Sequence, residues 1–246
     1  MISSIFAIMK KIAMIPARYA ASRFPGKLMQ KLGDKTVIKR VYEATNNTKL
    51  FDDVIVVTDS DVIEEEIKAI GRNVLRSKKE HESGSDRIAE AAADLDVDII
   101  LNVQGDTPFI KKEPLQKLLN LFDDETVQVA SLMQIISDEK VISDPNRVKV
   151  VVDKKNNSLL FSRSIIPYPR NETTSTVYYE HVGVYAFRKK ALLDFTTWPV
   201  TPLEDAEKIE CLRYLENGIS LRMALTDYIG ISIDTPEDLE KAKSLL

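Results

Sequence analysis

The most constraining feature of this 246-residue sequence is an alternation of short apolar runs with amphipathic segments. The apolar runs lie at residues 12–15, 52–59 and 98–106. Segments with apolar residues at helical spacing follow them at 37–45, 62–71 and 114–122. This alternation predicts a mostly parallel β-sheet with helices on both faces.

Three loops are expected to share one edge of that sheet, because ligands of such sheets bind beyond the carboxyl ends of the strands. These loops are residues 16–27, 58–61 and 104–108. Asp61 is interpreted as the N-cap of the helix at 62–71, and Gly71 as its C-cap. The opening loop and the 104–108 loop therefore become the first places to look for a site.

The pattern changes after about residue 128. Consecutive strand-like runs are predicted at 127–135, 148–153, 158–164 and 177–187. Strands with few helices between them favour an antiparallel extension or an inserted lobe, here at approximately 129–200. A helix is predicted at 202–218, two short strands at 219–227 and 229–234, and a closing helix after Thr235.

The chain is expected to be a single domain over residues 9–246, with residues 1–8 preceding a natural start at Met9. Its net charge of −4 argues against nucleic acid as a partner. Membrane insertion is not expected, since no run approaches the roughly 20 apolar residues of a span. One cysteine and two histidines favour a reducing, cytoplasmic compartment and disfavour a zinc site.

The loop IPARYAASRFPGK, residues 15–27, carries three cations among small residues. Arg18, Arg23 and Lys27 suit a phosphate group, because arginine binds phosphate oxygens in pairs and lysine acts as a mobile point charge. A solvated basic loop is the alternative. The loop has neither the Walker A nor the dinucleotide-binding glycine pattern.

Two aspartates are candidates for a magnesium site. Asp106 ends the run at 98–106, and Asp234 ends the expected strand at 229–234. Mg²⁺ takes hard oxygen ligands and few protein carboxylates. The alternatives are a turn at Gly105-Asp106 and an N-cap at Asp234. Together with the basic loop, the aspartates suggest metal-assisted phosphoryl or nucleotidyl transfer.

The segment SGSDRIAEA, residues 83–91, reads as a helix start whose amides suit an anion or a base edge, with Arg87 in its first turn. A capped surface helix is the alternative. The string Asp59-Ser60-Asp61 matches the metal motif of glycosyltransferases, but Asp61 is explained as a helix cap.

Seven segments in order resemble one family, 3-deoxy-manno-octulosonate cytidylyltransferase, also called CMP-Kdo synthetase. They are IPARYAASRFPGK, ESGSDRIAEA, NVQGDTP, VKVVVD with LLFSRSIIPYPR, HVGVYAFR, PLEDAEKIECLRYLENG and IDTPEDL. The resemblance runs from about Met9 to the C-terminus. It implies a Rossmann-like nucleotidyltransferase fold, similar to glycosyltransferase A, with a smaller β-rich lobe that forms a homodimer.

The resemblance also implies the reaction CTP + Kdo → CMP-Kdo + diphosphate with Mg²⁺, for lipopolysaccharide biosynthesis. Arg18 and Lys27 would hold the CTP phosphates, with Arg23 near the reacting groups. Ser83, Gly84 and Gln104 would help to read the nucleotide. Asp106 and Asp234 would carry Mg²⁺. The sugar would contact Arg23, Arg87, Arg163, Arg170, His181, Tyr185, Glu210 and Cys211.

Two positions depart from the family's pattern. Thr107 stands where a glutamate is usual, and Cys211 stands where a glutamine is usual. A thiol is a weaker hydrogen-bond donor than an amide, so the acceptor sugar could be an analogue such as 8-amino-Kdo. Two other functions stay open: a non-catalytic nucleotide-binding homologue, and CMP-activation of a sialic-acid-like nonulosonate.

Overall fold

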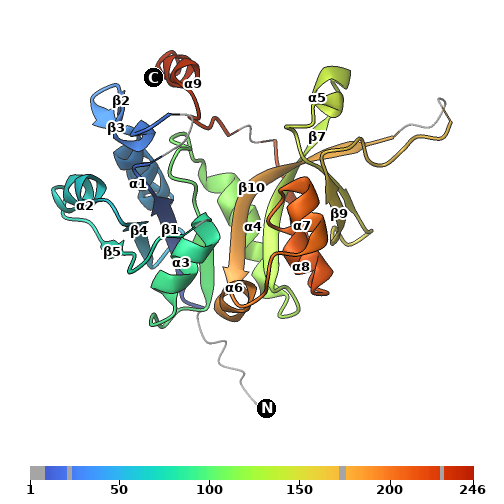
Figure 1. Cartoon of the computed structure of the whole chain (residues 1–246), viewed down its shortest axis with the longest axis horizontal. Helices are drawn as coiled ribbons and strands as arrows, with labels where there is room; N and C mark the ends of the chain where they lie inside the picture. Colours follow the sequence, from blue (N-terminus) through green and yellow to red (C-terminus); the bar gives the residue numbers. More distant parts are fainter. Residues whose placement is uncertain (1–8, 21–23, 82, 172–175, 228–229) are drawn as a thin grey trace.

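The computed structural model describes residues 9–20, 24–81, 83–171, 176–227 and 230–246. Within these residues one mixed sheet contains nine strands (Figure 1). They are β1 (Lys11–Ala17), β4 (Asp53–Thr58), β5 (Val74–Arg76), β6 (Ile99–Asn102), β7 (Val129–Ile136), β8 (Lys149–Val152), β9 (Ser158–Ser162), β10 (Tyr178–Arg188) and β11 (Leu221–Leu225). A separate hairpin pairs β2 (Lys31–Leu32) with β3 (Lys35–Thr36).

The main path of the sheet runs β11-β7-β10-β6-β1-β4-β5. Strand β1 lies between β4 and β6 and is parallel to both, and β4 is parallel to β5. Strand β10 is antiparallel to both β6 and β7. The expected mostly parallel α/β sheet is therefore confirmed, with β10 as the reversed strand near its centre.

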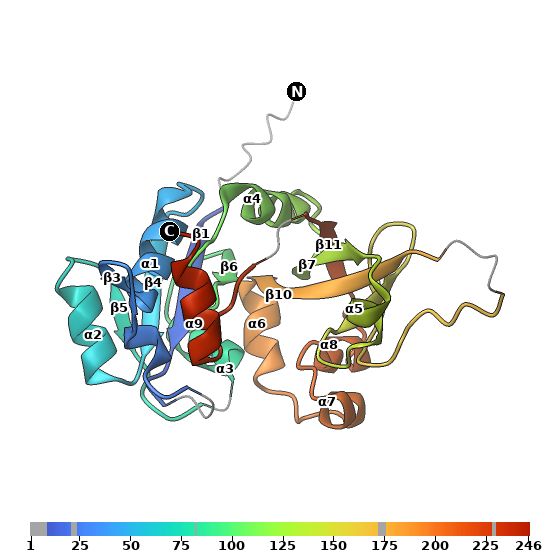
Figure 2. The same cartoon turned by 90° about the horizontal axis from the view of Figure 1, so that it is seen from above.

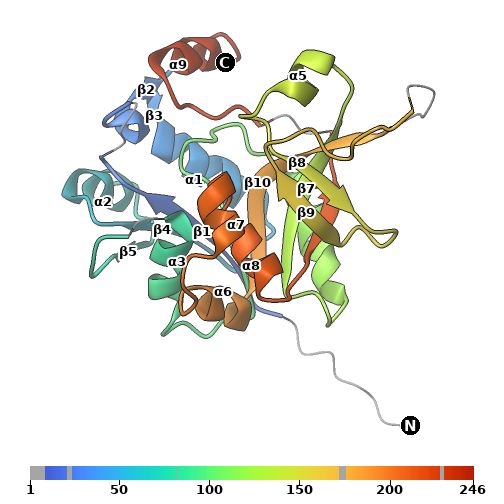
Figure 3. The same cartoon turned by 45° about the vertical axis from the view of Figure 1, so that its right-hand side comes forward.

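An antiparallel extension lies at one end of the molecule (Figure 3). Strand β8 pairs with β9 on one side and with Tyr179 and Glu180 of β10 on the other. The far end of the same strand, from Tyr185 to Arg188, pairs with β6 in the main sheet. Strand β10 thus joins the extension and the central sheet in one continuous element.

Helices cover both faces of the sheet (Figure 2). One face is covered by α1 (Val37–Asn47), α2 (Asp61–Lys68), α4 (Lys112–Asn120) and α9 (Pro236–Lys243). The other is covered by α3 (Gly84–Ala92), α6 (Lys189–Phe195) and α8 (Leu212–Glu216). The short helices α5 (Glu139–Ser143) and α7 (Pro202–Glu207) and the 3₁₀ turns η1 (Lys27–Met29) and η2 (Leu121–Asp123) complete the elements.

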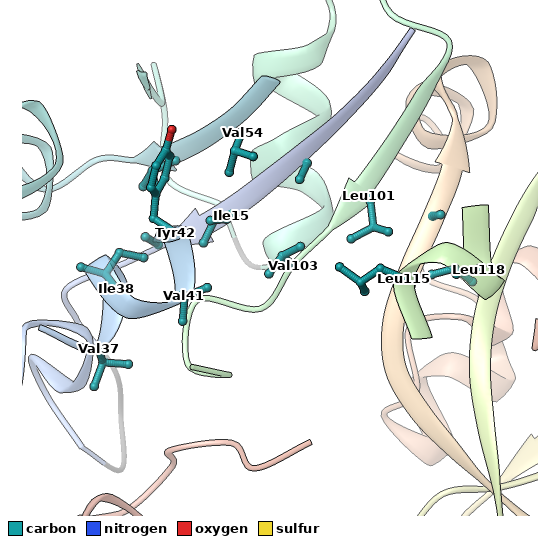
Figure 4. Close-up of a cluster of buried hydrophobic side chains, with 14 of the residues drawn as sticks. Ile15, Val37, Ile38, Val41, Tyr42, Val54, Leu101, Val103, Leu115 and Leu118 are labelled. Carbon is teal, nitrogen blue, oxygen red and sulfur yellow. The ribbon is translucent and has the colours of Figure 1, made fainter. Parts of the chain in front are cut away.

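The apolar residues of β1 divide between the two cores because strand side chains alternate in direction. Ala13 and Ile15 join the core under α1, whereas Ile12 and Met14 join the core under α3. Figure 4 shows the first core, in which side chains of α1, including Val41, face Ile15 and other residues of the sheet. Burial on both faces explains why the strands read as continuous apolar runs.

Three local expectations are wrong. Ser60, not Asp61, is the N-cap of α2, and its hydroxyl accepts a hydrogen bond from the Ile63 amide. The helix expected over 202–218 is interrupted at Lys208, which adopts a left-handed φ of 51°. Residues 230–234 form no strand, so Asp234 lies in an extended approach to α9.

Helix α9 begins with a capping box between Thr235 and Asp238, and the N-cap proposed for Asp234 is therefore wrong. None of the helices in the described ranges combines the length and the hydropathy that crossing a bilayer requires.

Candidate active site

A cavity of about 390 Å³ opens at the carboxyl ends of β1 and β6, beside the first turn of α3. This size is within the range of about 300–1,000 Å³ typical of ligand pockets. Its lining includes eight of the residues singled out from the sequence: Arg18, Lys27, Ser83, Gly84, Arg87, Gln104, Asp106 and Asp234. Pro16, Phe24 and His81 are among the others. The expected meeting of the 16–27 and 104–108 loops is thus confirmed, whereas residues 59–61 line a neighbouring hollow rather than this cavity.

Asp106 and Asp234 meet at the ammonium group of Lys27. Its Nζ lies 2.5 Å from Asp106 Oδ2 and 3.0 Å from Asp234 Oδ1. Asp106 and Asp234 are 128 positions apart in the chain. Their main-chain segments are joined by a hydrogen bond from the Ile233 amide to the Asp106 carbonyl oxygen, at 2.9 Å. This main-chain hydrogen bond helps to place Asp234 beside Asp106 although residues 230–234 form no strand.

The two carboxylates stabilise the protonated form of Lys27. Burial acts to lower the pKa of this lysine, but the charges and hydrogen bonds of Asp106 and Asp234 outweigh it, and the pKa is raised. A single point within reach of both carboxylates is suited to a cation, and here the ammonium group occupies it. Two carboxylates with access to phosphate oxygens and water match the ligand preference of Mg²⁺.

Glycine 105 permits close approach of the strand ends. A Cβ at this position would lie 3.0 Å from the Pro16 carbonyl oxygen and 3.4 Å from a methyl carbon of Leu28. Any larger residue would push the loop carrying Asp106 away from the loop that follows β1. The small residue therefore sets the spacing between the carboxylates and the basic loop.

Helix α3 presents its N-terminus to the cavity. The Ser83 hydroxyl caps it by accepting from the Asp86 amide at 3.1 Å. A Cβ on Gly84 would lie 3.1 Å from Pro16, so the helix start packs directly against the end of β1. The expected helix start at Ser83 is thus confirmed, and its amides are available to the cavity.

A second polar cluster lies beside β10, on the face covered by α8. Burial raises the pKa of both Tyr185 and Cys211, whose hydroxyl and thiol interact. Burial also raises the pKa of Glu210, against a hydrogen bond with Ser85 in α3 that lowers it. His181 Nε2 lies 2.9 Å from the Ser131 hydroxyl. This cluster offers buried hydrogen-bonding groups whose charged forms are disfavoured by burial.

A groove of about 280 Å³ joins the His181 side of this cluster to the main cavity through Gln104. Its lining also includes Thr107, Gln134, Arg147 and Glu180. The structure therefore offers two adjoining compartments, as a reaction between two different substrates needs.

Comparison with known proteins identifies the family. A family model described as Cytidylyltransferase matches residues 12–224. The 3-deoxy-manno-octulosonate cytidylyltransferase of Flavobacterium johnsoniae is 58% identical over 97% of this chain and 99% of that protein. The chain belongs to the 3-deoxy-manno-octulosonate cytidylyltransferase family.

Other members of this cytidylyltransferase family agree. The Bacteroides thetaiotaomicron protein of the same name is 43% identical, with 97% and 98% of the two chains covered. The solved structure of CMP:2-keto-3-deoxy-manno-octonic acid synthetase complexed with CTP superposes with a TM-score of 0.91. It is 37% identical and covers 96% of this chain and 98% of that chain. The fold and the nucleotidyltransferase class predicted from the sequence are confirmed.

Not every residue assigned to the sugar lies in the second cluster of this cytidylyltransferase. Arg87 lines the charged cavity, and its guanidinium donates to Asp59 Oδ2 at 2.7 Å and Ser77 Oγ at 2.9 Å. Arg163 donates to the main-chain carbonyls of Pro145, Glu207 and Lys208. Both guanidinium groups are thus engaged by the protein.

Two more predicted residues stand apart. Arg170 is exposed on the extension. Arg23 lies outside the described residues. The sugar contacts assigned to these arginines and to Arg87 and Arg163 stay predictions.

The glycosyltransferase-like string forms no shared metal site. Asp59 pairs with Arg87, and Asp61 pairs with Arg76. In the part of the chain that the structure describes, no group of three or more histidine, cysteine or acidic side chains is arranged to hold a metal.

Sequence reasoning missed two features of the site. His81 lines the charged cavity and is paired with Glu90 of α3. Asn102, at the end of β6, is 2% exposed and its Oδ1 has no hydrogen-bond partner among the described residues. Asn102 lies in a segment already quoted for other residues and His81 immediately precedes one, but a buried histidine or asparagine side chain has no spacing signal to reveal it.

Proposed function

We propose that this enzyme transfers the cytidylyl group of CTP to the anomeric hydroxyl of 3-deoxy-manno-octulosonate. The oxygen of that hydroxyl forms a bond to the α-phosphorus, the bond to the β-phosphate bridge oxygen breaks, and diphosphate leaves; the hydroxyl proton is released. The product is the CMP-sugar. The names of the relatives support this acceptor, and the CTP-bound structural neighbour supports the nucleotide.

The observation that carries the proposal is the meeting of Asp106, Asp234 and Lys27 in the cavity that Arg18 also lines. Cations at this place suit the triphosphate, and carboxylates suit a divalent cation. We propose Mg²⁺ as the cofactor, held by Asp106 and Asp234. When bound, it would neutralise charge that develops on the phosphate oxygens.

The two cations that line the cavity, Arg18 and Lys27, have different roles in this proposal. Arg18 is exposed at the cavity mouth and can follow the phosphates as they enter. Lys27 is 14% exposed, and its ammonium lies between the two carboxylates that would hold Mg²⁺, so it would turn toward the phosphates when the metal binds.

The acceptor is proposed to bind in the cluster of His181, Tyr185, Glu210 and Cys211. Burial disfavours the charged forms of His181, Tyr185 and Glu210, and all three side chains can exchange hydrogen bonds with sugar hydroxyls. Cys211 is 2% exposed and in contact with Tyr185, so its side chain tunes the shape and polarity of the compartment.

We further propose a cytoplasmic homodimer that supplies the CMP-sugar for lipopolysaccharide assembly. The support for a dimer is the set of large exposed apolar residues on and beside the extension. They are Ile135, Leu159, Ile165, Tyr168 and Val177, with Tyr168 85% exposed. Exposed apolar groups gathered on one part of a chain mark interaction surfaces.

The test is an acceptor panel with CTP and Mg²⁺, in which diphosphate release is measured. The panel contains Kdo, 8-amino-Kdo and a sialic-acid-like nonulosonate, and each reaction is repeated with chelator in place of metal. Release with Kdo that needs both CTP and the metal is the expected result. Binding of CTP in calorimetry without release from any acceptor would instead support a non-catalytic homologue.

A further inference from the structure

The loop that precedes α3 is held in place by side chains of the helix it introduces. This approach loop comprises residues 77–83, of which Glu82 lies outside the described residues. Arg87 Nη1 donates to the Ser77 hydroxyl at the start of the loop. The capping Ser83 fixes its end. The middle of the loop has its own anchor, Glu90.

Glu90 makes two contacts through one oxygen. Its Oε2 accepts from the Lys78 amide at 3.1 Å and lies 2.8 Å from His81 Nε2. Glu90 is on the second turn of α3, and its side chain is 19% exposed. A single carboxylate therefore holds the loop at two points, in a partly shielded place where such hydrogen bonds are strong.

The pairing turns the main chain of His81 toward the cavity. The imidazole is 4% exposed, whereas the residue as a whole is only partly buried. Its accessible atoms are therefore mainly those of the peptide backbone. Since His81, Ser83 and Gly84 all line the charged cavity, the approach loop presents peptide groups to whatever binds there.

We propose that Glu90, acting through His81, is a positioning residue for recognition of the nucleotide base. Cytosine and uracil differ where the first presents an amino donor and the second a carbonyl acceptor. Peptide groups distinguish these edges only when they are fixed, because a mobile loop would rotate to satisfy either one. The Glu90 anchor fixes them. This inference rests on the proposed use of CTP.

The experiment compares Glu90→Ala and Glu90→Gln with wild type, with CTP or UTP as the nucleotide and Kdo as the acceptor. Glu90→Ala removes both anchors, and we expect KM for CTP to rise about tenfold or more, as for loss of a charge-assisted hydrogen bond. The preference for CTP over UTP should fall by a similar factor while kcat stays within about threefold. Glu90→Gln keeps an acceptor oxygen and should show a smaller change in the same direction.

The matched control is Glu113→Gln, on the exposed face of α4, where the carboxylate lies 3.0 Å from the ammonium group of Lys117. This control variant should change neither KM for CTP nor the preference for CTP over UTP. If Glu90→Ala fails to fold, Glu90→Gln and His81→Gln carry the test. An unchanged CTP/UTP ratio in correctly folded variants overturns the inference. Failure of wild type to use CTP would overturn the proposed function instead, and binding of CTP and UTP by calorimetry would then test the anchor.

Discussion

Lys27 shows how individual residues in this site control one another's charge. Its positive charge offsets part of the repulsion between the Asp106 and Asp234 carboxylates, which lie close together in the partly buried cavity. The three groups act as one unit, so removing any of them changes the state of the others. Substitutions here are therefore expected to be strongly non-additive.

Asp106→Asn is expected to lower kcat by roughly 10²–10³ while changing the dissociation constant of CTP by only about threefold, because charge stabilisation counts most in the transition state. Steady-state kinetics and calorimetry with CTP measure the two quantities. Asp123→Asn, at an exposed position of η2, is the control. Equal losses of binding and turnover would contradict the assignment.

His181 is neutral at physiological pH, since burial lowers its pKa from 6.5 to about 4. The unfolded chain takes up a proton near pH 6.5 and the folded chain only near pH 4, so this group makes stability fall as pH falls through that window. Relative to His181→Gln, wild type should lose about 1–3 kcal/mol of unfolding free energy between pH 7 and pH 4. Urea denaturation at several pH values tests this, and parallel curves would be inconsistent with a buried neutral imidazole.

Cys211→Gln should increase kcat/KM for Kdo relative to 8-amino-Kdo by about tenfold, since an amide restores hydrogen bonds that a buried thiol cannot make. The acceptor panel measures this ratio. Cys211→Ser is the control, because serine is similar in size to cysteine and lacks the length of glutamine. No change of selectivity with glutamine would mean that Cys211 serves packing alone.

At the scale of elements, the decisive feature is the break between α7 and α8. Lys208 is left-handed, and the chain turns there before reaching Glu210 and Cys211. Glu207 stabilises the turn, because its carboxylate accepts from the Ser162 hydroxyl at 2.6 Å and the Arg163 amide at 2.9 Å. The sequence shows a continuous helical pattern over 202–218, with no glycine at the break, so local reasoning could not find it.

Lys208→Gly should raise the free energy of unfolding by about 0.5–1 kcal/mol, because glycine adopts a positive φ without the steric cost of a Cβ. The same replacement at Lys190 in α6 should instead cost up to about 1 kcal/mol. Thermal melts of both variants give the comparison. Lys208→Val should destabilise the protein and raise KM for the acceptor, and an unchanged KM would separate the turn from the sugar compartment.

At the scale of the whole molecule, the extension is the surface from which we expect a partner subunit to be recognised. Tyr168→Glu should shift the protein to a monomer in sedimentation velocity, since a charge buried at an apolar interface is costly. Val62→Glu, at an exposed apolar position on α2, should leave the assembly unchanged. A wild-type monomer across micromolar concentrations would contradict the proposed dimer.

The sequence predicted the parallel half of the sheet well, because runs such as 52–59 are apolar on both faces and helices follow them. It also predicted that Arg18, Lys27 and Asp106 share a cavity, since loops after parallel strands meet at one edge. It could not show that Arg87 and Arg163 are engaged by Asp59 and main-chain carbonyls, or that His81 pairs with Glu90. Such contacts join residues whose spacing in the chain carries no periodic signal.

Strand β10 has a mechanical consequence for catalysis. Its first half belongs to the extension and its second half to the central sheet, and its pairing with β7 shifts register between Val182 and Tyr185. A bulge is the place where a strand bends, and a Cβ built on Gly183 within it meets no atom within 4 Å. A movement of the extension would therefore reach Tyr185 along β10 and the paired β7, through the bulge at Gly183.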